Sequence, residues 1–384
     1  MTFIDWFAGI GGFRRGMELA GHECVGFCEF DKYAVASYTS MHLITDEQRK
    51  YLETLDLRSR QKEILKEEYR NGEWFADDIR RVYAGDIPKA DCWCFGFPCQ
   101  DISISGKQLG FTGNRSSLFF RVMYLLGQLE EEKMPHVLFI ENVKNLLSVN
   151  GGWDFARLLS ELDKGGFDAE WQILNSKDFG VPQNRERCFI IGPLRGSGGR
   201  EIFPLGQDCG EAAELQGQQN RVIAPTLLAG QRGPANGVYP IQGGGVLDLS
   251  FPESKTRRGR VIDGGETSPT LNTGCEIGVV QIGNIYGTEN EPNPKAGRVY
   301  DADGISPTLG ANSGGNNMPI INQSIEDKVI RIRKLTPKEC FRLQGWTDDY
   351  FEKAQFVNSD SQLYKQAGNG VTVNVIYEIA RRME

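Results

Sequence analysis

The opening residues combine a strand-like run with a glycine-rich turn, and this combination constrains the fold more than any other feature. Residues 2–7 are rich in β-forming side chains, and residues 8–16 (Ala-Gly-Ile-Gly-Gly-Phe-Arg-Arg-Gly) follow directly. A strand that turns through glycines into a helix lets the backbone approach a nucleotide-like ligand closely, because glycine has no Cβ. Taken alone, the pattern fits a plain tight turn equally well.

A second predicted strand strengthens the signal. Residues 24–28 are apolar and end in Glu29, an acid in the position that usually holds a ribose diol. Together the two features favour an adenosine-containing ligand. They predict an α/β fold with a doubly wound, mostly parallel sheet.

A cysteine follows another apolar run. Residues 91–95 predict a buried strand, and residues 96–100 (Gly-Phe-Pro-Cys-Gln) come directly after it. Cys99 therefore lies at the carboxyl end of a strand, where open α/β folds bind ligands. By itself, the pentapeptide fits a structural turn with a buried cysteine as well as it fits a nucleophile.

Two polar clusters flank further predicted strands. Residues 136–140 lead into Glu141, whose carboxylate can face the same crevice as Cys99. Residues 183–187 (Gln-Asn-Arg-Glu-Arg) precede a strand predicted at residues 188–192, and alternation places Arg185 and Arg187 on one face of an extended segment. Near a thiol and a carboxylate, two arginines would form a wall that binds an anion or a carbonyl. A solvated acid and surface ion pairs are the alternative interpretations.

In their order along the chain, these blocks resemble those of the DNA (cytosine-5) methyltransferase family, of bacterial or phage type. The resemblance extends from residue 1 to about residue 380 and implies the S-adenosylmethionine-dependent methyltransferase fold. The loop at residues 103–107 and the helix start at residues 335–340 are also similar to the family's. The five main blocks are residues 7–12, 96–100, 141–143, 183–187 and 366–371.

The resemblance implies methyl transfer from S-adenosylmethionine to carbon-5 of cytosine in a specific DNA sequence. Carbon-5 is a poor nucleophile, and addition of the Cys99 thiolate at carbon-6 makes it enamine-like. Glu141, protonated in a desolvated site, would donate to ring nitrogen N3, and Arg187 would bind the ring carbonyl. Arg185 would hold the site together or touch phosphate. The sequence does not identify the base that removes the carbon-5 proton.

The resemblance also implies a set of cofactor contacts. Phe7, Gly9 and Gly11 would form the floor of the site, and Glu29 would take the ribose hydroxyls. An adenine contact at residues 86–87 would follow a short strand predicted around residues 82–83. The full predicted set is Phe7, Gly9, Gly11, Glu29, Asp86, Ile87, Pro98, Leu118, Asn369 and Val371.

The implied substrate is double-stranded DNA with the target cytosine flipped out, because a stacked base is out of reach of a thiol. Glycines and basic residues at 100–115 predict a mobile lid that meets phosphates, with Ser105 entering the duplex gap. An ordinary flexible loop is the alternative. The predicted DNA contacts are Ser103, Ser105, Lys107, Arg115, Thr270 and Thr308.

Composition divides the chain. Residues 195–325 hold 24 of the 46 glycines and 10 of the 16 prolines, which predicts a smaller, loop-rich β domain for target recognition. This domain would interrupt a catalytic domain formed by residues 1–194 and 326–384. A charged, helical insert at about residues 45–81 is expected to be a solvated lobe without a functional site. The helix at 371–382 is expected to pack beside the first strand.

The smaller domain contains an internal repeat. The sequence Gly-Arg-Val followed by Ser-Pro-Thr-Leu occurs at residues 259–271 and again at 297–309, an offset of 38 positions. A looser copy lies at residues 221–227. A duplicated β scaffold is one interpretation, and loops that read base edges in the major groove are the other. Tandem copies carrying more than one target specificity are a further hypothesis.

Charge and cysteine usage limit the other classes. The net charge of −8 gives no support for tight non-specific binding to nucleic acid, although a local basic cleft stays open. Cys92 and Cys94 alternate along a strand and are expected in the core, so no metal is predicted. Residue 1 leads into the first strand without a signal peptide, and no apolar run approaches the ~20 residues that span a membrane. We expect a cytoplasmic, DNA-associated monomer, with a cognate restriction enzyme as a functional rather than physical partner.

Three other functions compete with DNA methylation. RNA methylation is disfavoured by the size of the recognition domain, since a related tRNA enzyme has a much reduced one. A catalytically dead DNA-binding relative is disfavoured because Cys99, Glu141 and Arg187 are all present. A nicotinamide oxidoreductase explains only the glycine turn.

Overall fold

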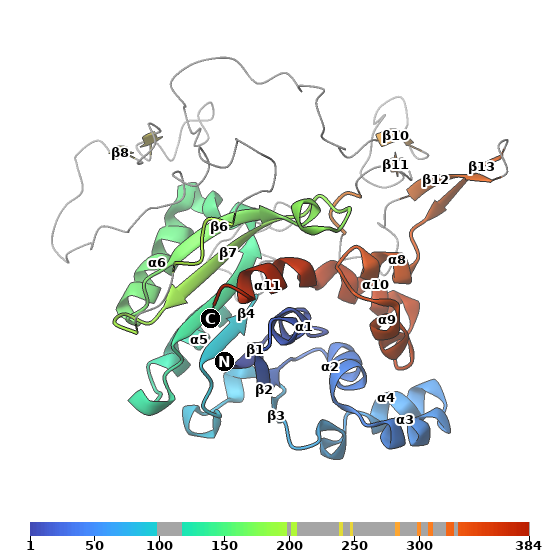
Figure 1. Ribbon diagram of the computed structural model, residues 1–384, viewed down its shortest axis with the longest axis horizontal. Coiled ribbons are helices and arrows are strands. Elements are labelled where there is room, and N and C mark those ends of the chain that lie inside the picture. The colour runs from blue at the N-terminus through green and yellow to red at the C-terminus, as the bar shows by residue number, and fades with distance from the viewer. Residues whose placement is uncertain are drawn as a thin grey trace.

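The computed structural model describes most of the predicted catalytic domain and short pieces of the rest. The described residues are 1–97, 117–197, 201–205, 238–240, 246–248, 281–284, 298–300, 306–309, 320–325 and 329–383. Its centre is a seven-stranded sheet in the order β3-β2-β1-β4-β5-β7-β6 (Figure 1). The strands are β1 (Thr2–Trp6), β2 (Glu23–Cys28), β3 (Trp74–Ala76), β4 (Cys92–Phe95), β5 (Val137–Val143), β6 (Glu170–Asn175) and β7 (Glu186–Pro193).

Strand direction confirms the predicted fold class. The strands from β3 to β5 run parallel, and β7 is antiparallel to both β5 and β6. The predicted strands at residues 2–7, 24–28, 91–95, 136–140 and 188–192 are all present.

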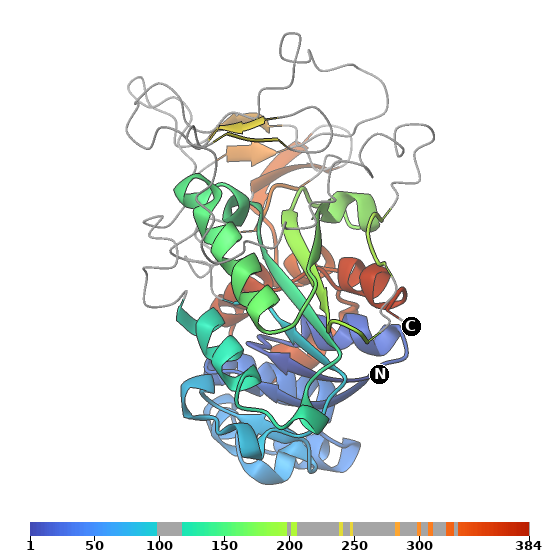
Figure 2. The same ribbon diagram turned by 90° about the vertical axis from the view of Figure 1, so that its left-hand side faces the viewer.

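Helices cover both faces of the sheet (Figures 1 and 2). Helices α5 and α6 pack on one face, and α1 and α11 pack on the other. A Cβ on Gly16 would lie 2.5 Å from Ile376 Cβ, so α1 and α11 are in close contact, as predicted for the returning C-terminal helix. The helices are α1 (Gly12–Leu19), α2 (Lys32–Tyr38), α3 (Asp46–Glu53), α4 (Leu57–Glu63), α5 (Ser117–Leu126), α6 (Trp153–Lys164), α8 (Pro337–Arg342), α9 (Asp348–Gln355), α10 (Asp360–Asn369) and α11 (Val373–Ala380).

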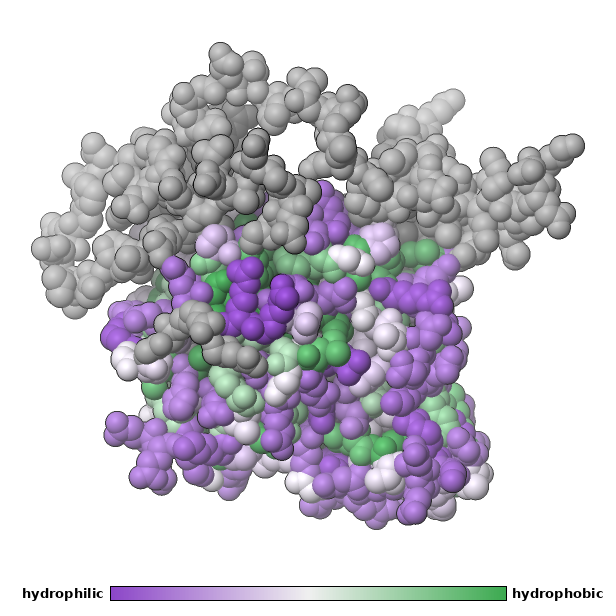
Figure 3. Space-filling view, viewed as in Figure 1, coloured by the Kyte–Doolittle hydropathy of each residue, from purple (hydrophilic) through white to green (hydrophobic). Residues whose placement is uncertain are grey.

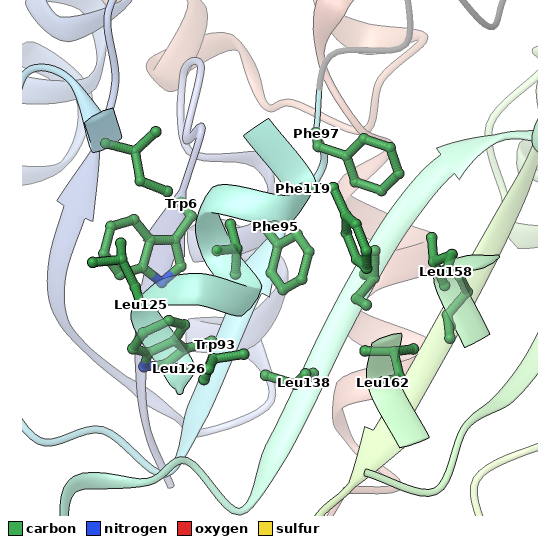
Figure 4. Close-up of a cluster of buried hydrophobic side chains, with 14 of the residues drawn as sticks. Trp6, Trp93, Phe95, Phe97, Phe119, Leu125, Leu126, Leu138, Leu158 and Leu162 are labelled. Atoms are coloured by element: carbon green, nitrogen blue, oxygen red, sulfur yellow. The ribbon is translucent and has the colours of Figure 1, made fainter. Parts of the chain in front are cut away.

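Strand β4 supplies both halves of the core. Trp93 and Phe95 join the cluster under α5 and α6 (Figure 4), whereas Cys92 and Cys94 face α1 and α11. All four side chains are fully buried. The two-residue period of a strand buried on both faces explains this continuous apolar run, and it confirms that Cys92 and Cys94 are core residues.

The insert is partly as predicted. Helices α3 and α4 form a largely hydrophilic lobe (Figure 3), with Leu52, Ile64 and Tyr69 as its buried anchors. The predicted strand around residues 82–83 is wrong, because residues 79–81 and 84–86 form 3₁₀ turns. The third strand is instead β3, where Trp74 packs on Gly26, and Phe75 packs on Phe27 with ring centroids 4.9 Å apart.

The glycine-rich region contributes short strands. Strands β10 (Gln281–Asn284), β11 (Arg298–Tyr300), β12 (Ile320–Ile325) and β13 (Val329–Lys334) form a four-stranded sheet, and β8 (Val238–Pro240) pairs with β9 (Val246–Asp248). The predicted boundary between residues 325 and 326 falls inside the antiparallel pair of β12 and β13, so β13 belongs with the smaller sheet. Among the described helices, none is long and apolar enough to cross a membrane.

Candidate active site

The turn between β1 and α1 adopts the backbone conformation that glycine favours. Gly9 and Gly11 have φ angles of 57° and 83°, and Phe7 has a positive φ of 55°. The amide of Gly9 donates to Glu29 Oε2 at 2.8 Å, which ties the end of β2 to this turn. The structure therefore brings together Phe7, Gly9, Gly11 and Glu29, as the sequence predicts.

The Glu29 carboxylate is strongly held by backbone donors. Its second oxygen accepts from the amide of Asp31 at 2.7 Å. Burial raises the pKa of Glu29, and the amides of Asp31 and Gly9 oppose this rise. A partly buried carboxylate with fixed geometry suits recognition of a ligand hydroxyl pair or a cation.

A cavity of about 550 Å³ opens beside Glu29. Phe30, which is 71% exposed, stands at this cavity and is a residue that sequence reasoning missed. The same cavity is bordered by Leu65 and Arg70, so the insert is not merely a solvated lobe. The polar and aromatic lining includes Glu29, Phe30, Trp74, Asp77, Asp78 and Asp86.

The predicted pair Asp86 and Ile87 is divided between the cavity and the core. Asp86 is exposed and borders the cavity, but Ile87 is 1% exposed and belongs to the apolar core. Neither follows a strand. The acids that follow the third strand are Asp77 and Asp78, because β3 ends at Ala76. The amide of Glu29 donates to Ala76 O at 3.1 Å, so the ends of β2 and β3 lie side by side.

The turn after α10 lies against the glycine turn. A Cβ on Gly12 would lie 2.7 Å from Val371 Cγ2, so the two segments touch. Asn369 ends α10 and is exposed. Leu118 on α5 packs at the edge of the core cluster that contains Phe97. Val371 therefore lies beside the glycine turn, although the two segments are far apart in the sequence.

Glu141 and Arg187 form an ion pair, with Arg187 Nε 3.1 Å from Glu141 Oε1. The side chains are only 11% and 16% exposed, respectively. A Cβ on Gly96 would lie 3.0 Å from Glu141 Oε2, so the carboxylate faces the start of the Gly-Phe-Pro-Cys-Gln block. Next to it, Asn142 Nδ2 donates to Phe97 O at 3.4 Å.

Arg185 has a different partner from Arg187. Its Nη2 donates to Gly370 O at 2.7 Å and to Gly368 O at 3.3 Å. Arg185 is 3% exposed, and its hydrogen bonds link the segment at residues 183–187 to the turn after α10. This arrangement agrees with a residue that holds the site together.

Five of the six described cysteines have thiols whose pKa is raised by burial. Burial raises the pKa of Cys24 and of Cys340 to about 12, and it also raises the pKa values of Cys28, Cys94 and Cys188. A thiol held protonated in this way is a poor nucleophile. In the described part of the chain, no group of three or more His, Cys, Asp or Glu residues could hold a metal ion.

The predicted DNA contacts are mostly untested. The predicted nucleophile Cys99 and the predicted cofactor contact Pro98 lie outside the described residues. So do five of the predicted DNA contacts, namely Ser103, Ser105, Lys107, Arg115 and Thr270. Thr308 is described, and its hydroxyl donates to Asn184 O at 2.7 Å. The nearby Ser306 forms an isolated β-bridge with Gln183, and Leu309 is buried, with 2% of its surface exposed. This copy of Ser-Pro-Thr-Leu therefore packs on the predicted catalytic domain.

Comparison with known proteins gives a consistent result. The family model for C-5 cytosine-specific DNA methylase matches residues 1–205 and 259–384. The type II methyltransferase M.HhaI of Haemophilus parahaemolyticus is 31% identical, over 99% of this chain and 93% of the relative. The type II methyltransferase M.Bsp6I of a Bacillus species is 30% identical, over 100% of this chain and 98% of its own.

Solved structures share the fold. The Dnmt2 methyltransferase of S. pombe aligns with a TM-score of 0.56 and 15% identity, covering 99% of this chain and 97% of that one. A putative DNA modification methyltransferase from an E. coli prophage aligns with a TM-score of 0.54 and 19% identity, covering 100% and 98%.

Proposed function

Because this chain belongs to the C-5 cytosine-specific DNA methylase family and is a DNA (cytosine-5) methyltransferase, we propose a specific chemical course for it. It methylates a cytosine flipped out of a defined double-stranded DNA sequence, using S-adenosylmethionine and a transient bond between Cys99 and carbon-6. The observation that carries the proposal is the Glu141–Arg187 pair, which lies against Gly96, three residues before Cys99.

Several features support S-adenosylmethionine as the ligand of the cavity beside Glu29. The glycine turn allows close backbone approach, and Glu29 can accept from ribose hydroxyls. Charged groups of both signs border this cavity and can contact both the cationic groups and the carboxylate of this ligand: Glu29, Asp77, Asp78 and Asp86 with Lys32, Arg70 and Arg81. The adenine contact is proposed at Asp86 and Ile87, and Phe30, Asp77 and Asp78 border the same cavity as Asp86. S-adenosylmethionine supplies an activated methyl group, and its sulfur keeps the bonding electron pair.

The remaining chemistry is the work of this chain's own residues. The Cys99 thiolate bonds to carbon-6, and the electrons of the C5=C6 double bond then form the new bond from carbon-5 to the methyl carbon. A base removes the carbon-5 proton, the double bond re-forms, and Cys99 leaves as the thiolate.

Glu141 and Arg187 are proposed to hold the edge of the cytosine ring. Glu141, when protonated, donates to N3 and offsets the negative charge that thiolate attack places on the ring. Arg187 donates to the ring carbonyl. Their low exposure keeps water away from these contacts, which strengthens both hydrogen bonds.

Recognition of DNA is assigned to the glycine-rich region at residues 195–325. Base flipping costs a few kcal/mol, which contacts from this region and from Lys107 and Arg115 would offset. Because Thr308 bonds Asn184 O, we propose that it fixes this region to the catalytic block instead of touching DNA.

The experiment that tests the proposal uses S-adenosylmethionine labelled in its methyl group. The purified protein is incubated with unmethylated bacterial DNA or with tRNA, and the nucleosides are separated after digestion. We expect label in 5-methyl-2′-deoxycytidine from DNA alone. Label in the tRNA digest would favour the RNA-methylation alternative, and no label in either digest from folded protein would contradict the proposed activity.

A further inference from the structure

The turn that follows α10 is held by side chains from two distant segments. Arg185 Nη2 bonds the carbonyls of Gly368 and Gly370, and Gln344 Nε2 bonds the carbonyl of Ala367 at 2.8 Å. Gln344 lies just after α8 and is fully buried. Two carbonyls in the last turn of α10 and one just after it are therefore held by side chains from other segments.

A buried hydroxyl relay completes this arrangement. Thr372 Oγ1 donates to Gln344 Oε1 at 3.0 Å, which leaves Ser176 Oγ as the donor to Thr372 Oγ1 at 2.8 Å. Ser176 and Thr372 are each 3% exposed. The amide of Ser176 also donates to Arg185 O at 3.1 Å, so the relay returns to the residue that holds Gly368 and Gly370.

The other side of the turn faces the proposed cofactor site. Val371 lies so close to Gly12 that a Cβ on Gly12 would be 2.7 Å from the Cγ2 of Val371. In the last turn of α10, the Gln366 side chain accepts from Ser37 Oγ at 3.0 Å, and its Nε2 donates to Tyr33 O at 3.0 Å. The turn is thus a rigid element between the arginine-bearing block and the glycine turn.

We infer that Thr372 is a positioning residue whose buried hydroxyl, relayed through Ser176 and Gln344, presets the turn at residues 369–371 for S-adenosylmethionine. The inference rests on the function proposed above. A turn already held in its binding geometry loses little conformational entropy when the ligand arrives, so removing the relay lowers affinity. Thr372 acts through the turn and does not touch the methyl donor or the base.

The physical reason is the cost of orphaned polar groups. Thr372→Val keeps the side-chain shape but leaves Gln344 Oε1 without its donor in a dry site, and Ser176 Oγ keeps only Arg185 O, at 3.4 Å, as an acceptor. The Gln344 side chain must turn away before its Oε1 can reach another donor, and this turn also breaks its hydrogen bond to the carbonyl of Ala367. The turn then samples conformations in which Val371 no longer rests on Gly12.

The test is calorimetric titration of the full-length protein with S-adenosylmethionine and with S-adenosylhomocysteine. We expect Thr372→Val to raise Kd about tenfold and Thr372→Ser, which keeps the hydroxyl, to restore it to within about twofold. In assays on DNA, KM for S-adenosylmethionine should rise more than kcat falls. Ser176→Ala should shift Kd in the same direction, and it serves as the test if Thr372→Val does not fold.

A matched control separates positioning from general stability. Thr2→Val also removes a threonine hydroxyl, which donates to Asp91 Oδ2 at 2.9 Å. This hydrogen bond lies at the opposite edge of the sheet, where β1 begins. It should lower the melting temperature without changing Kd. Wild-type affinity in Thr372→Val, or an equal loss in Thr2→Val, would overturn the inference. A wild-type protein that binds neither ligand would instead overturn the proposed cofactor site, and the inference with it.

Discussion

Glu141 and Arg187 meet diagonally across two antiparallel strands. Glu141 on β5 lies opposite Phe189 on β7, and Arg187 lies opposite Val143, so the two charged residues share a face two positions apart. Their ion pair, with Nε 3.1 Å from Oε1, places a carboxyl group and a guanidinium side by side at the carboxyl end of β5. Such a pair can bind the adjacent nitrogen and carbonyl groups of a pyrimidine edge.

Removal of either partner should disable catalysis while leaving cofactor binding intact. We expect Glu141→Gln and Arg187→Ala each to lower kcat by about 100-fold or more, the usual cost of losing a group that stabilises developing negative charge. Kd for S-adenosylmethionine should stay within about twofold, since neither residue borders the cavity beside Glu29. Lys144→Ala is the control, because it breaks only the neighbouring exposed pair with Glu186. Equal losses in all three variants would contradict the assigned roles.

Cofactor affinity should depend on pH through Glu29. Its pKa is raised by burial, so the carboxylate gains a proton at a higher pH than an ordinary glutamate near 4.3. The ionised form accepts from the ribose hydroxyls, and affinity should therefore fall as pH is lowered through this raised pKa. Titration of S-adenosylmethionine from pH 8 downward measures the effect. Glu29→Gln should bind more weakly at pH 8 and lose the pH dependence; an unchanged profile would exclude Glu29 from the site.

The buried pair of Arg14 and Glu73 should matter for stability. Arg14 Nη1 bonds both carboxylate oxygens of Glu73, at 2.7 and 2.8 Å, and the side chains are 9% and 12% exposed. Glu73→Ala leaves Glu18, at 2.7 Å, as the remaining carboxylate on the guanidinium and should lower the free energy of unfolding by about 2 kcal/mol, the contribution of a hydrogen bond to a charged group. Urea unfolding measures it. Asp77→Ala, which breaks the exposed pair with Arg81, should cost about 0.5 kcal/mol or less; similar costs would refute the argument from burial.

The contact between Gly12 and Val371 should be intolerant of a methyl group. Gly12→Ala forces the turn after α10 away from the glycine turn, because Val371 Cγ2 and the carbonyl oxygen of Val371 lie 2.7 and 3.1 Å from the new Cβ. We expect overpacking to cost about 1–3 kcal/mol in stability and cofactor affinity to fall about fivefold or more. Gly21→Ala meets nothing within 4 Å and should cost only backbone strain at its φ of 89°. If Gly21→Ala weakened cofactor binding as much, the contact would not be the cause.

Sequence patterns were sufficient for the parts of the fold that depend on local signals. The strands β1, β2, β4 and β5 are mostly apolar, and each has glycines or an acid at or just after its carboxyl end. The third strand was misplaced because Val82 and Tyr83 have high β propensity, yet Tyr83 is 76% exposed. The true strand β3 has three residues and gains its stability from packing of Trp74 on Gly26, a contact invisible in sequence.

The site was predictable where a residue acts through its own chemistry. Glu29, Glu141 and Arg187 were predicted in this way, the structure places Glu141 beside Arg187 and Glu29 beside the glycine turn, and their roles stay predictions. The relay of Ser176, Thr372 and Gln344 was not, because its hydrogen bonds join residues separated by 28 and 196 positions and carry no periodic signal. The bonds from Arg185 to Gly368 and Gly370 were missed for the same reason.

The central claim is that Cys99 attacks cytosine in DNA. The most direct measurement is bisulfite sequencing of genomic DNA from cells without cytosine methylation of their own, expressing either wild-type protein or Cys99→Ser at equal soluble levels. We predict protected cytosines within a short recurring sequence for the wild type and none for the variant. Two distinct recurring sequences would support more than one target specificity. Wild-type protection in Cys99→Ser, or no protection by the folded wild-type protein, would contradict the account.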